Sequence, residues 1–308
     1  MKLGFQEYCV AYCDSKIENV LDIDQKEYTV IKNNWDSWSA DPFIFIWNDD
    51  IYIFAEVWKY SAGKGAIGYC KWDGEKKKFS RWKIVIQEKF HLSYPNIFIY
   101  KDQIMLCPES SGNGEIYLYT AVAFPEQWEK YCILSSEGKF LDTTFLRYSE
   151  SKNLGVTYEV RGSKEILRIF KISHGKAVFE NEEKIRQTSN KMRPGGNFII
   201  EENRIYRVCQ LGEPYYGRGI IIKEFSICSD GYCEKPLKEF TSDNFNVIGL
   251  HGKKRGVHTF NKNRNFSVID VRFERICVLP RVLRLGGKVI RTARKVNSFI
   301  KRGITDAE

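Results

Sequence analysis

The stretch WSADPFIFIWNDDIYIFAE, residues 38–56, contains two apolar and aromatic runs on either side of the turn sequence Asn48-Asp49-Asp50. Two such runs on either side of a short polar turn predict a β-hairpin. Asp41 precedes a proline at the start of the first run, and Glu56 ends the second run. The stretch therefore predicts two antiparallel strands, with one carboxylate near the start of the first and another at the end of the second.

The same strand-turn-strand pattern recurs at intervals of about fifty residues. The later copies are SYPNIFIYKDQIMLCPE (93–109), LDTTFLRYSESKNLGVTYE (141–159), MRPGGNFIIEENRIYRVCQ (192–210) and, most altered, GLHGKKRGVHTFNKNRNFSVID (249–270). Repeats of this length match four-stranded propeller blades, whereas ankyrin and tetratricopeptide repeats are shorter. We therefore predict an all-β fold, a five-bladed β-propeller over residues 1–275, with blades that start near 41, 94, 142, 193 and 249. The N-terminal run 7–12 would complete the fifth blade and leave the ring without a free edge.

The composition agrees with a large β-protein. The chain has 308 residues, of which 43% are hydrophobic and 14% aromatic, and it is rich in the side chains that strands favour. It contains no run of the ~20 apolar residues that a membrane-spanning helix needs, and it does not begin with a secretory signal. Its 9 cysteines are an odd number scattered through apolar runs, which is typical of free thiols in a reducing compartment. We expect a cytoplasmic protein without a structural metal or a cofactor.

Residues 276–308 differ in charge from the rest of the chain. The net charge is +9, and eight Lys or Arg residues with no acidic residue fall between positions 276 and 303. Apolar residues recur there every three or four positions, at Val282, Leu285, Val289, Ala293, Val296 and Ile300. This pattern predicts a basic amphipathic C-terminal helix that lies on an anionic membrane surface, at the inner face of the membrane. Packing on its own propeller or on a second subunit is the alternative. Nucleic acid is not an expected partner, because the remaining chain is nearly balanced in charge and has no nucleic-acid-binding motif.

The innermost strands of a propeller run along its axis, so equivalent positions in successive blades converge on one axial pocket. Carboxylates gathered there suit sugar chemistry, because one acts as a base or nucleophile while a neighbour with a raised pKa donates a proton. The candidate catalytic residues are Asp41, Asp142, Glu109 and Glu56. The candidate substrate-binding residues are Tyr94, Glu159, Arg193, His251, Arg255 and His258, and the cations among them suit a phosphorylated sugar. The alternative for each acid is a turn or a solvent-facing strand end.

Several of these stretches resemble a known family. SADPFIF, HLSYPNIFIYKDQIMLCPES, LDTTF, RPGGNFI and GVHTFN are similar to the hydrolase-like domain in the N-terminal part of glucosamine inositolphosphorylceramide transferases, over about residues 35–272. Similar domains accompany bacterial sugar-modifying enzymes such as formyltransferases. The wider resemblance is to the five-bladed propellers of glycoside hydrolase families 32, 43 and 68, which implies that Asp41 is a catalytic carboxylate. Family 43 places a further Asp in the second blade and a Glu acid in the third. Here those positions read Tyr94 and Asp142, so that acid-base set does not carry over.

Three functions fit these patterns. The first is a glycosyltransferase of cell-surface polysaccharide or glycolipid biosynthesis, with an activated, phosphorylated sugar as donor and a glycan or lipid-linked acceptor. Asp41 or Asp142 would be the base for the acceptor hydroxyl, and Arg193 and the fifth-blade cations would bind phosphate. The second is a glycoside hydrolase that uses Asp41 with Glu109 or Asp142. The third is a sugar-binding propeller without activity, in which aromatic residues stack on sugar rings. The basic tail and the missing second-blade acid favour the first.

Overall fold

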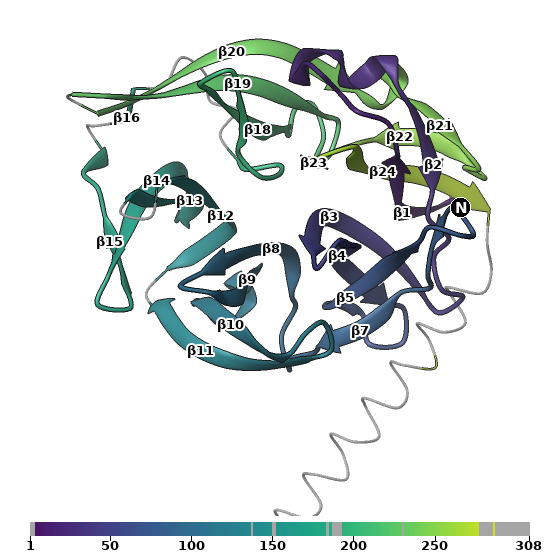
Figure 1. Cartoon of the computed structure of the whole chain (residues 1–308), viewed down its shortest axis with the longest axis horizontal. Coiled ribbons are helices and arrows are strands. Elements are labelled where there is room, and N and C mark those ends of the chain that lie inside the picture. The colour runs from purple at the N-terminus through teal and green to yellow at the C-terminus, as the bar shows by residue number, and fades with distance from the viewer. Residues whose placement is uncertain are drawn as a thin grey trace, which may run out of the picture.

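The computed structural model shows five β-sheets arranged in a ring around a central axis (Figure 1). It describes residues 4–136, 138–149, 152–182, 185–186, 193–229, 231–276 and 286. The predicted all-β, five-bladed propeller is confirmed. The predicted C-terminal helix lies outside the described residues, apart from positions 276 and 286. Within the described ranges, no helix has the length and apolar character needed to span a membrane.

The first two blades contain the first two repeats. Blade one holds β3 (Ser37–Trp47), β4 (Asp50–Lys59), β5 (Lys64–Asp73), β6 (Lys78–Phe79) and β7 (Lys83–Ile86). Blade two holds β8 (Ser93–Tyr100), β9 (Gln103–Glu109), β10 (Ile116–Ala123) and β11 (Gln127–Ser135). The innermost hairpins turn at Asn48-Asp49 and Lys101-Asp102, where all four residues have positive φ. Two-residue turns of this type match the right-handed twist of the strands that they join.

The third and fourth blades follow the same plan. Blade three holds β12 (Lys139–Ser149), β13 (Lys152–Arg161), β14 (Lys164–Ser173) and β15 (Lys176–Phe179). Blade four holds β17 (Ile199–Glu201), β18 (Arg204–Leu211), β19 (Gly219–Cys228), β20 (Gly231–Thr241) and β16 (Ile185–Arg186), which pairs in parallel with β20. Short 3-10 helices at Val20–Gln25, Ser111–Asn113 and Ser242–Asn244 connect strands.

The two ends of the propeller meet in blade five. It holds β1 (Gly4–Cys13), β2 (Glu27–Val30), β21 (Asn246–Ile248), β22 (Lys253–Gly256), β23 (Phe260–Asn263) and β24 (Phe266–Ile276). β1 lies between β2 and β24, and its pairing with β24 runs from Gly4 opposite Ile276 to Cys13 opposite Ser267. The N-terminal strand thus closes the ring where the sequence predicts it.

The hydrophobic core is divided among the interfaces between neighbouring blades. Phe43 and Phe54 of blade one pack with Leu106 of blade two. On the other side of blade one, Ile53 packs with Val10 of blade five. Because side chains alternate between the two faces of a strand, each blade packs on both of its neighbours and the inner strands are held in place.

Candidate active site on the propeller axis

The innermost strands of the first three blades carry a β-bulge at the same place. Asp41, Tyr94 and Asp142 lie where two residues of the inner strand oppose one residue of its partner, and their φ angles are +51°, +45° and +51°. Positive φ is strained for residues other than glycine, and a bulge turns a side chain out of the regular pleat. The three positions are therefore structurally equivalent, as the repeat predicts.

Asp41 lies beside His258 and Asp270 of blade five. His258 Nε2 is 3.3 Å from Asp41 Oδ1, and its Nδ1 is 2.6 Å from Asp270 Oδ2. The backbone N–H of Asp41 donates to Asp270 Oδ2 at 3.1 Å. The N–H groups of His258 and Thr259 donate to Asp270 Oδ1 at 2.9 and 3.1 Å. Asp270 therefore fixes both the bulge at Asp41 and the imidazole between the two carboxylates, and all three side chains are buried.

Burial and neighbouring charges set the protonation of this trio. Burial raises the pKa of Asp41 to about 7, and Asp270 adds to the rise while His258 opposes it. Burial would raise the pKa of Asp270, but His258 and backbone N–H groups outweigh it and lower that pKa. Burial would lower the pKa of His258, but the two carboxylates outweigh it and raise that pKa. An imidazolium paired with Asp270 follows, and Asp41 gains or loses its proton near neutral pH.

The same trio has the spacing of a metal-binding group. One ligand atom each from Asp41, His258 and Asp270 lies within 4.8 Å of the others. Both ring nitrogens of His258 face carboxylate oxygens, and the raised pKa of His258 favours the imidazolium, a form that has no lone pair for a metal. We therefore interpret the trio as a group that holds and moves a proton.

Glu56 and Glu109, which end the second strands of blades one and two, differ in their contacts. Burial raises the pKa of Glu56 well above its ordinary value, and the neighbouring carboxylates add to the rise. Among the described residues, Glu56 Oε1 has no hydrogen-bond partner, and His91 Nε2 lies 3.7 Å from it. Glu109 accepts hydrogen bonds from the Ser93 hydroxyl at 3.0 Å and the Ser111 N–H at 2.9 Å. Glu56 is therefore the carboxyl group best suited to keep its proton at neutral pH.

Glu159 departs from this pattern by one residue. Glu56 lies opposite Ala40, next to the bulge of blade one, whereas Tyr158 takes that place opposite Leu141 in blade three. A shift of one residue turns a side chain to the other face of the sheet. There Glu159 Oε2 is held by Arg161 at 2.9 Å and by Arg168 at 2.8 Å. Of the three candidate glutamates, Glu56 and Glu109 therefore hold equivalent positions and Glu159 does not.

Asp142 is buried and shares one oxygen between two residues of blade four. Arg193 Nε lies 2.5 Å and Gln210 Nε2 2.7 Å from Asp142 Oδ2. Burial raises the pKa of Asp142, and Arg193 opposes that rise. The Arg193 guanidinium also lies over the ring of Tyr216, with Cζ 5.2 Å from its centroid, and the Tyr216 ring meets His258 at 5.4 Å. The Arg193 side chain is 26% exposed, so it contacts both solvent and the buried Asp142 carboxylate.

The remaining predicted substrate-binding residues are Tyr94, His251 and Arg255. Tyr94 is buried in the core, and the other two lie away from the acids. Tyr94 is fully buried, and its hydroxyl lies 2.9 Å from Thr144 Oγ1 and 2.7 Å from the N–H of Gly196, so it joins three blades. His251 is exposed in the segment before β22, and Arg255 is paired with Glu274 at 2.6 Å. Glu56 and the four acids that raise its pKa are called the axial cluster below: Asp41, Glu56, Glu109, Asp142 and Asp270.

Sequence reasoning misses several members of this site. Asp270 and Gln210 end the fifth and fourth repeats, as Glu56 ends the first, and that position is the signal that identifies them. His91 carries no such signal. Its Nδ1 accepts the Gly65 N–H at 2.9 Å, so in the neutral tautomer its Nε2 proton faces Glu56. Burial lowers the pKa of His91, which favours that neutral form.

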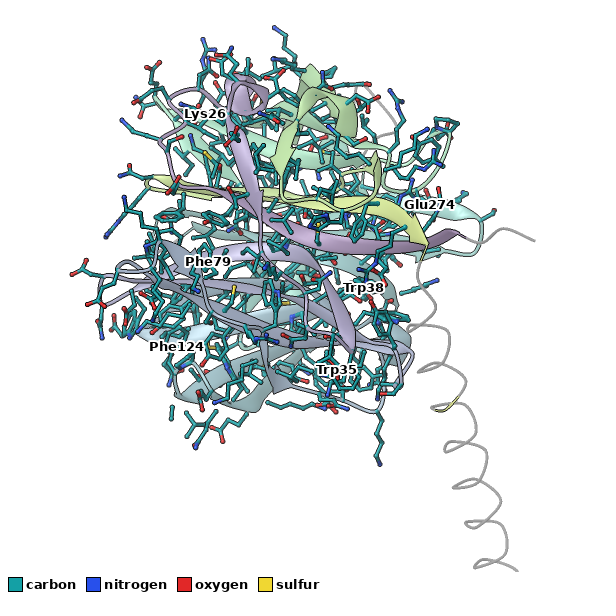
Figure 2. The ribbon with its side chains drawn as sticks, turned by 90° about the vertical axis from the view of Figure 1, so that its right-hand side faces the viewer. Lys26, Trp35, Trp38, Phe79, Phe124 and Glu274 are labelled. Carbon is teal, nitrogen blue, oxygen red and sulfur yellow. The ribbon has the colours of Figure 1, made fainter. Side chains whose placement is uncertain are left out.

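Aromatic residues lie beside the axial cluster at one face of the disc. Trp38 stacks on Trp58, with ring centroids 5.4 Å apart, and also contacts Tyr8 of β1, whose ring is 5.0 Å from His258. Figure 2 shows Trp38 and Glu274 at this face and Phe79 at the opposite one. A cavity of about 460 Å³ is lined in part by Phe79, and none of the axial cluster is among its described lining residues. The aromatic residues beside the axial cluster therefore mark one face of the disc, called the aromatic face below.

The propeller is similar to solved family 43 glycoside hydrolases. A β-xylosidase/α-arabinofuranosidase from a compost microbial metagenome matches with a TM-score of 0.55 and 9% identity, covering 79% of this chain and 91% of that one. The GH43_1 enzyme from Xanthomonas citri matches with a TM-score of 0.53 and 10% identity, covering 78% and 88%. At this identity the likeness shows the fold alone.

Sequence comparison gives relatives named glucosamine inositolphosphorylceramide transferase 1. The one from Oryza sativa subsp. indica is 26% identical over 239 residues, which cover 73% of this chain and 30% of the relative. The one from Arabidopsis thaliana is 26% identical over 202 residues, which cover 62% and 26%. The chain therefore spans less than a third of the length of these relatives. The family model described as "Glucosamine inositolphosphorylceramide transferase 1, N-terminal" matches residues 28–271, nearly the whole propeller. The chain belongs to this family of N-terminal domains.

Proposed function

We propose that the protein is a glycosyltransferase of cell-surface polysaccharide or glycolipid biosynthesis, which uses an activated, phosphorylated sugar at the propeller axis. The observation that carries this proposal is the buried Asp41 carboxyl, whose pKa of about 7 and contact with His258 make it a base that works near neutral pH. His258 is in turn fixed by Asp270 at 2.6 Å. A base oriented by a second group and a third behind it is the arrangement that proton transfer from a hydroxyl requires.

In this reaction Asp41 takes the proton of the acceptor hydroxyl. The hydroxyl oxygen forms the new bond to the anomeric carbon, while the bond from that carbon to the leaving phosphate oxygen breaks and its electron pair stays on the phosphate. Arg193, beside Asp142, is the partly exposed cation that would face the developing charge. Glu56 would act as a neutral hydrogen-bond donor to the sugar.

The names of the curated relatives support transfer to a lipid-linked acceptor. These relatives are more than three times as long as the part they share with this chain, so their activity belongs to the whole protein. We extend to this chain only the class of reaction and of substrate. The tail 276–303, with its excess of basic residues, would bring the propeller to the cytoplasmic face of an anionic membrane, where such acceptors lie.

A second candidate is hydrolysis of a glycoside. The observation that favours it is the pair of Glu56, with a strongly raised pKa, and Asp41 in one cluster, because one protonated and one ionised carboxyl group are what glycosidases use. The family 43 fold is compatible with it. A third candidate, sugar binding without turnover, rests on the stacked Trp38 and Trp58.

The decisive test mixes the purified full chain with nucleotide sugars and short-chain lipid or glycan acceptors and follows products by mass spectrometry. We expect a product heavier by one sugar, and its loss by about 100-fold or more in Asp41→Asn. The matched control is Asp49→Asn, an exposed acid at the tip of the same hairpin, which should keep full activity. Free sugar from glycosides in place of transfer would establish the hydrolase, and ligand affinity without any product would establish the binding module.

A further inference from the structure

Arg272 of β24 has a positive charge that no carboxylate compensates within the described part of the chain. Its Nη1 donates to the backbone oxygen of Tyr216 at 2.7 Å, and its Nη2 to that of Arg255 at 3.1 Å. Its Nε is buried and finds no hydrogen-bond partner among the described residues. Its guanidinium also lies against the ring of Tyr215, with Cζ 5.0 Å from the centroid. The two carbonyl contacts orient the guanidinium but leave its charge in place.

Arg272 lies between the axial cluster and the aromatic face of the disc. Asp270, Arg272 and Glu274 alternate along β24, so their side chains share one face of the strand. Asp270 is buried in the axial cluster, and Glu274 lies at the face that also holds Trp38 (Figure 2). Opposite Arg272 on β1 is Tyr8, the residue whose ring contacts His258. The guanidinium is therefore at the rim of the site.

Three arginines of blades four and five and His258 differ from Arg272 because each of them has an acidic partner. Arg193 is bound to Asp142, Arg255 lies 2.6 Å from Glu274, and Arg218 lies 3.6 Å from Glu239. His258 is held between Asp41 and Asp270. Each of these cations is paired with a carboxylate, whereas Arg272 has no such partner among the described residues and can pair with the anion of a ligand.

We propose that Arg272, with the loop 212–218 that carries Tyr215 and Tyr216, is a subsite for the phosphate or diphosphate ester of the sugar substrate. This inference rests on the proposed glycosyl transfer and names the part of the donor that the rim binds. Nη1 and Nη2 each carry a second N–H beyond their carbonyl contacts, and these two N–H groups can donate to phosphate oxygens, while the Tyr215 ring beside them helps to hold the guanidinium. Placed beside the axial cluster, Arg272 stabilises the charge that collects on the leaving phosphate. A neutral glycan has only uncharged hydroxyl groups, so it has no negative charge to pair with Arg272.

The test is calorimetric titration of the full chain with inorganic pyrophosphate, uridine diphosphate, guanosine diphosphate and a short-chain prenyl phosphate. We expect Arg272→Gln to weaken binding of the phosphate probes by about 10- to 100-fold, since one charge-assisted contact of this kind is lost. Added salt should weaken binding to the wild type more than to the variant. Arg272→Lys keeps the charge without the planar fork and should give an intermediate loss. The control is Arg264→Gln, an exposed arginine in the turn between β23 and β24, which should bind as the wild type does.

The probes separate the sources of the phosphate. Binding of the nucleotide diphosphates alone assigns the subsite to a nucleotide-sugar donor, and binding of the prenyl phosphate alone assigns it to a lipid-linked one. The proposal is overturned if the wild type binds none of the probes at millimolar concentration, or if Arg272→Gln binds them equally well. If Arg272→Gln melts early, Tyr215→Leu replaces it, and unchanged phosphate affinity in that variant overturns the proposal. If phosphate binding depends on Arg272 while Asp41→Asn forms as much transfer product as the wild type, that result would support the phosphate subsite and reject the proposed role of Asp41 in glycosyl transfer.

Discussion

At the scale of single residues, the site depends on where a few protons lie. His258 stands between two carboxylates of unlike protonation, because Asp270 has three hydrogen-bonding N–H groups around it and Asp41 does not. Burial therefore acts on the two acids with different results: the pKa of Asp41 is raised to about 7, and that of Asp270 is lowered. The proposed proton transfer near neutral pH depends on this difference between the two acids.

The first prediction concerns the pH dependence of activity. The pKa of Asp41 is raised from the ~3.9 of an unfolded chain to about 7, so between these values the folded chain holds a proton that the unfolded chain releases. This group's contribution to stability therefore declines as the pH rises from about 4 to 7, while the ionised base becomes available. We expect kcat/KM to rise with pH and level off above about 7. A profile that is flat from pH 5 to 8 in both the wild type and Asp49→Asn would contradict this role of Asp41.

The second prediction concerns the stability of the trio. His258→Gln leaves the buried Asp270 carboxylate without its counter-ion, which should lower the free energy of unfolding by about 3–5 kcal/mol. The double variant His258→Gln with Asp270→Asn removes the stranded charge and should lose less than the sum of the single changes. Urea unfolding of the three variants measures this coupling. Strict additivity would show that the two side chains do not form an ion pair.

At the scale of elements, the β-bulge repeated in three inner strands sets the positions of the residues at the propeller axis. The bulge places Asp41 and Asp142 at the axis in two blades, but in blade two the same position holds Tyr94, which binds the backbone of blade four. A Cβ at Gly196 would lie 2.0 Å from the oxygen of Phe260, so blade four needs glycine at the place that receives the Tyr94 hydroxyl. The same β-bulge thus places an axial acid in blades one and three and a packing residue in blade two.

The third prediction tests this packing role of the second blade. Tyr94→Phe removes the hydroxyl that contacts Thr144 and Gly196 and leaves a buried N–H without its partner. We expect the free energy of unfolding to fall by about 1–3 kcal/mol. Tyr100→Phe, at the end of the same strand, should change it by no more than about 0.5 kcal/mol. Equal effects of the two substitutions in a denaturant titration would argue against a special role for Tyr94.

The repeat made the inner hairpins predictable, but it did not fix every register. The strand-turn-strand pattern predicts β3 with β4 and β8 with β9, together with their turns. It does not reveal that the third hairpin is shifted by one residue, which turns Glu159 towards Arg161 and Arg168. Nor does it bring Asp270 to Asp41, because the hydrogen bond between them joins residues 229 positions apart and depends on closure of the ring. Local patterns predict elements, whereas the site is made by contacts between distant elements.

At the scale of the whole molecule, the strand pairing that closes the ring also brings together residues of the candidate site. β1 pairs with β24 along its full length and delivers Tyr8 to the side of His258. Trp38 of blade one contacts Tyr8, and Tyr216 of blade four contacts His258. The site therefore forms only when the first and last strands of the propeller have paired.

The fourth prediction concerns the proposed membrane surface. We expect the full chain to float with liposomes rich in anionic lipid, and a chain that ends at Arg275 to remain in the soluble fraction, because residues 276–303 carry the excess of Lys and Arg. Raising the salt concentration should reduce flotation, since screening weakens attraction to the surface. Equal flotation of the two chains, or of neither, would reject a membrane role for the tail.

The pairing of Gly4 with Ile276 has one more consequence. β24 passes from Asp270 in the axial cluster through Arg272 to Glu274 at the aromatic face, so both ends of the ring lie at that face. A domain or a fluorescent label that is joined to either end of the propeller would therefore lie near the aromatic face. The two ends of the propeller and its aromatic face therefore lie on the same side of the disc.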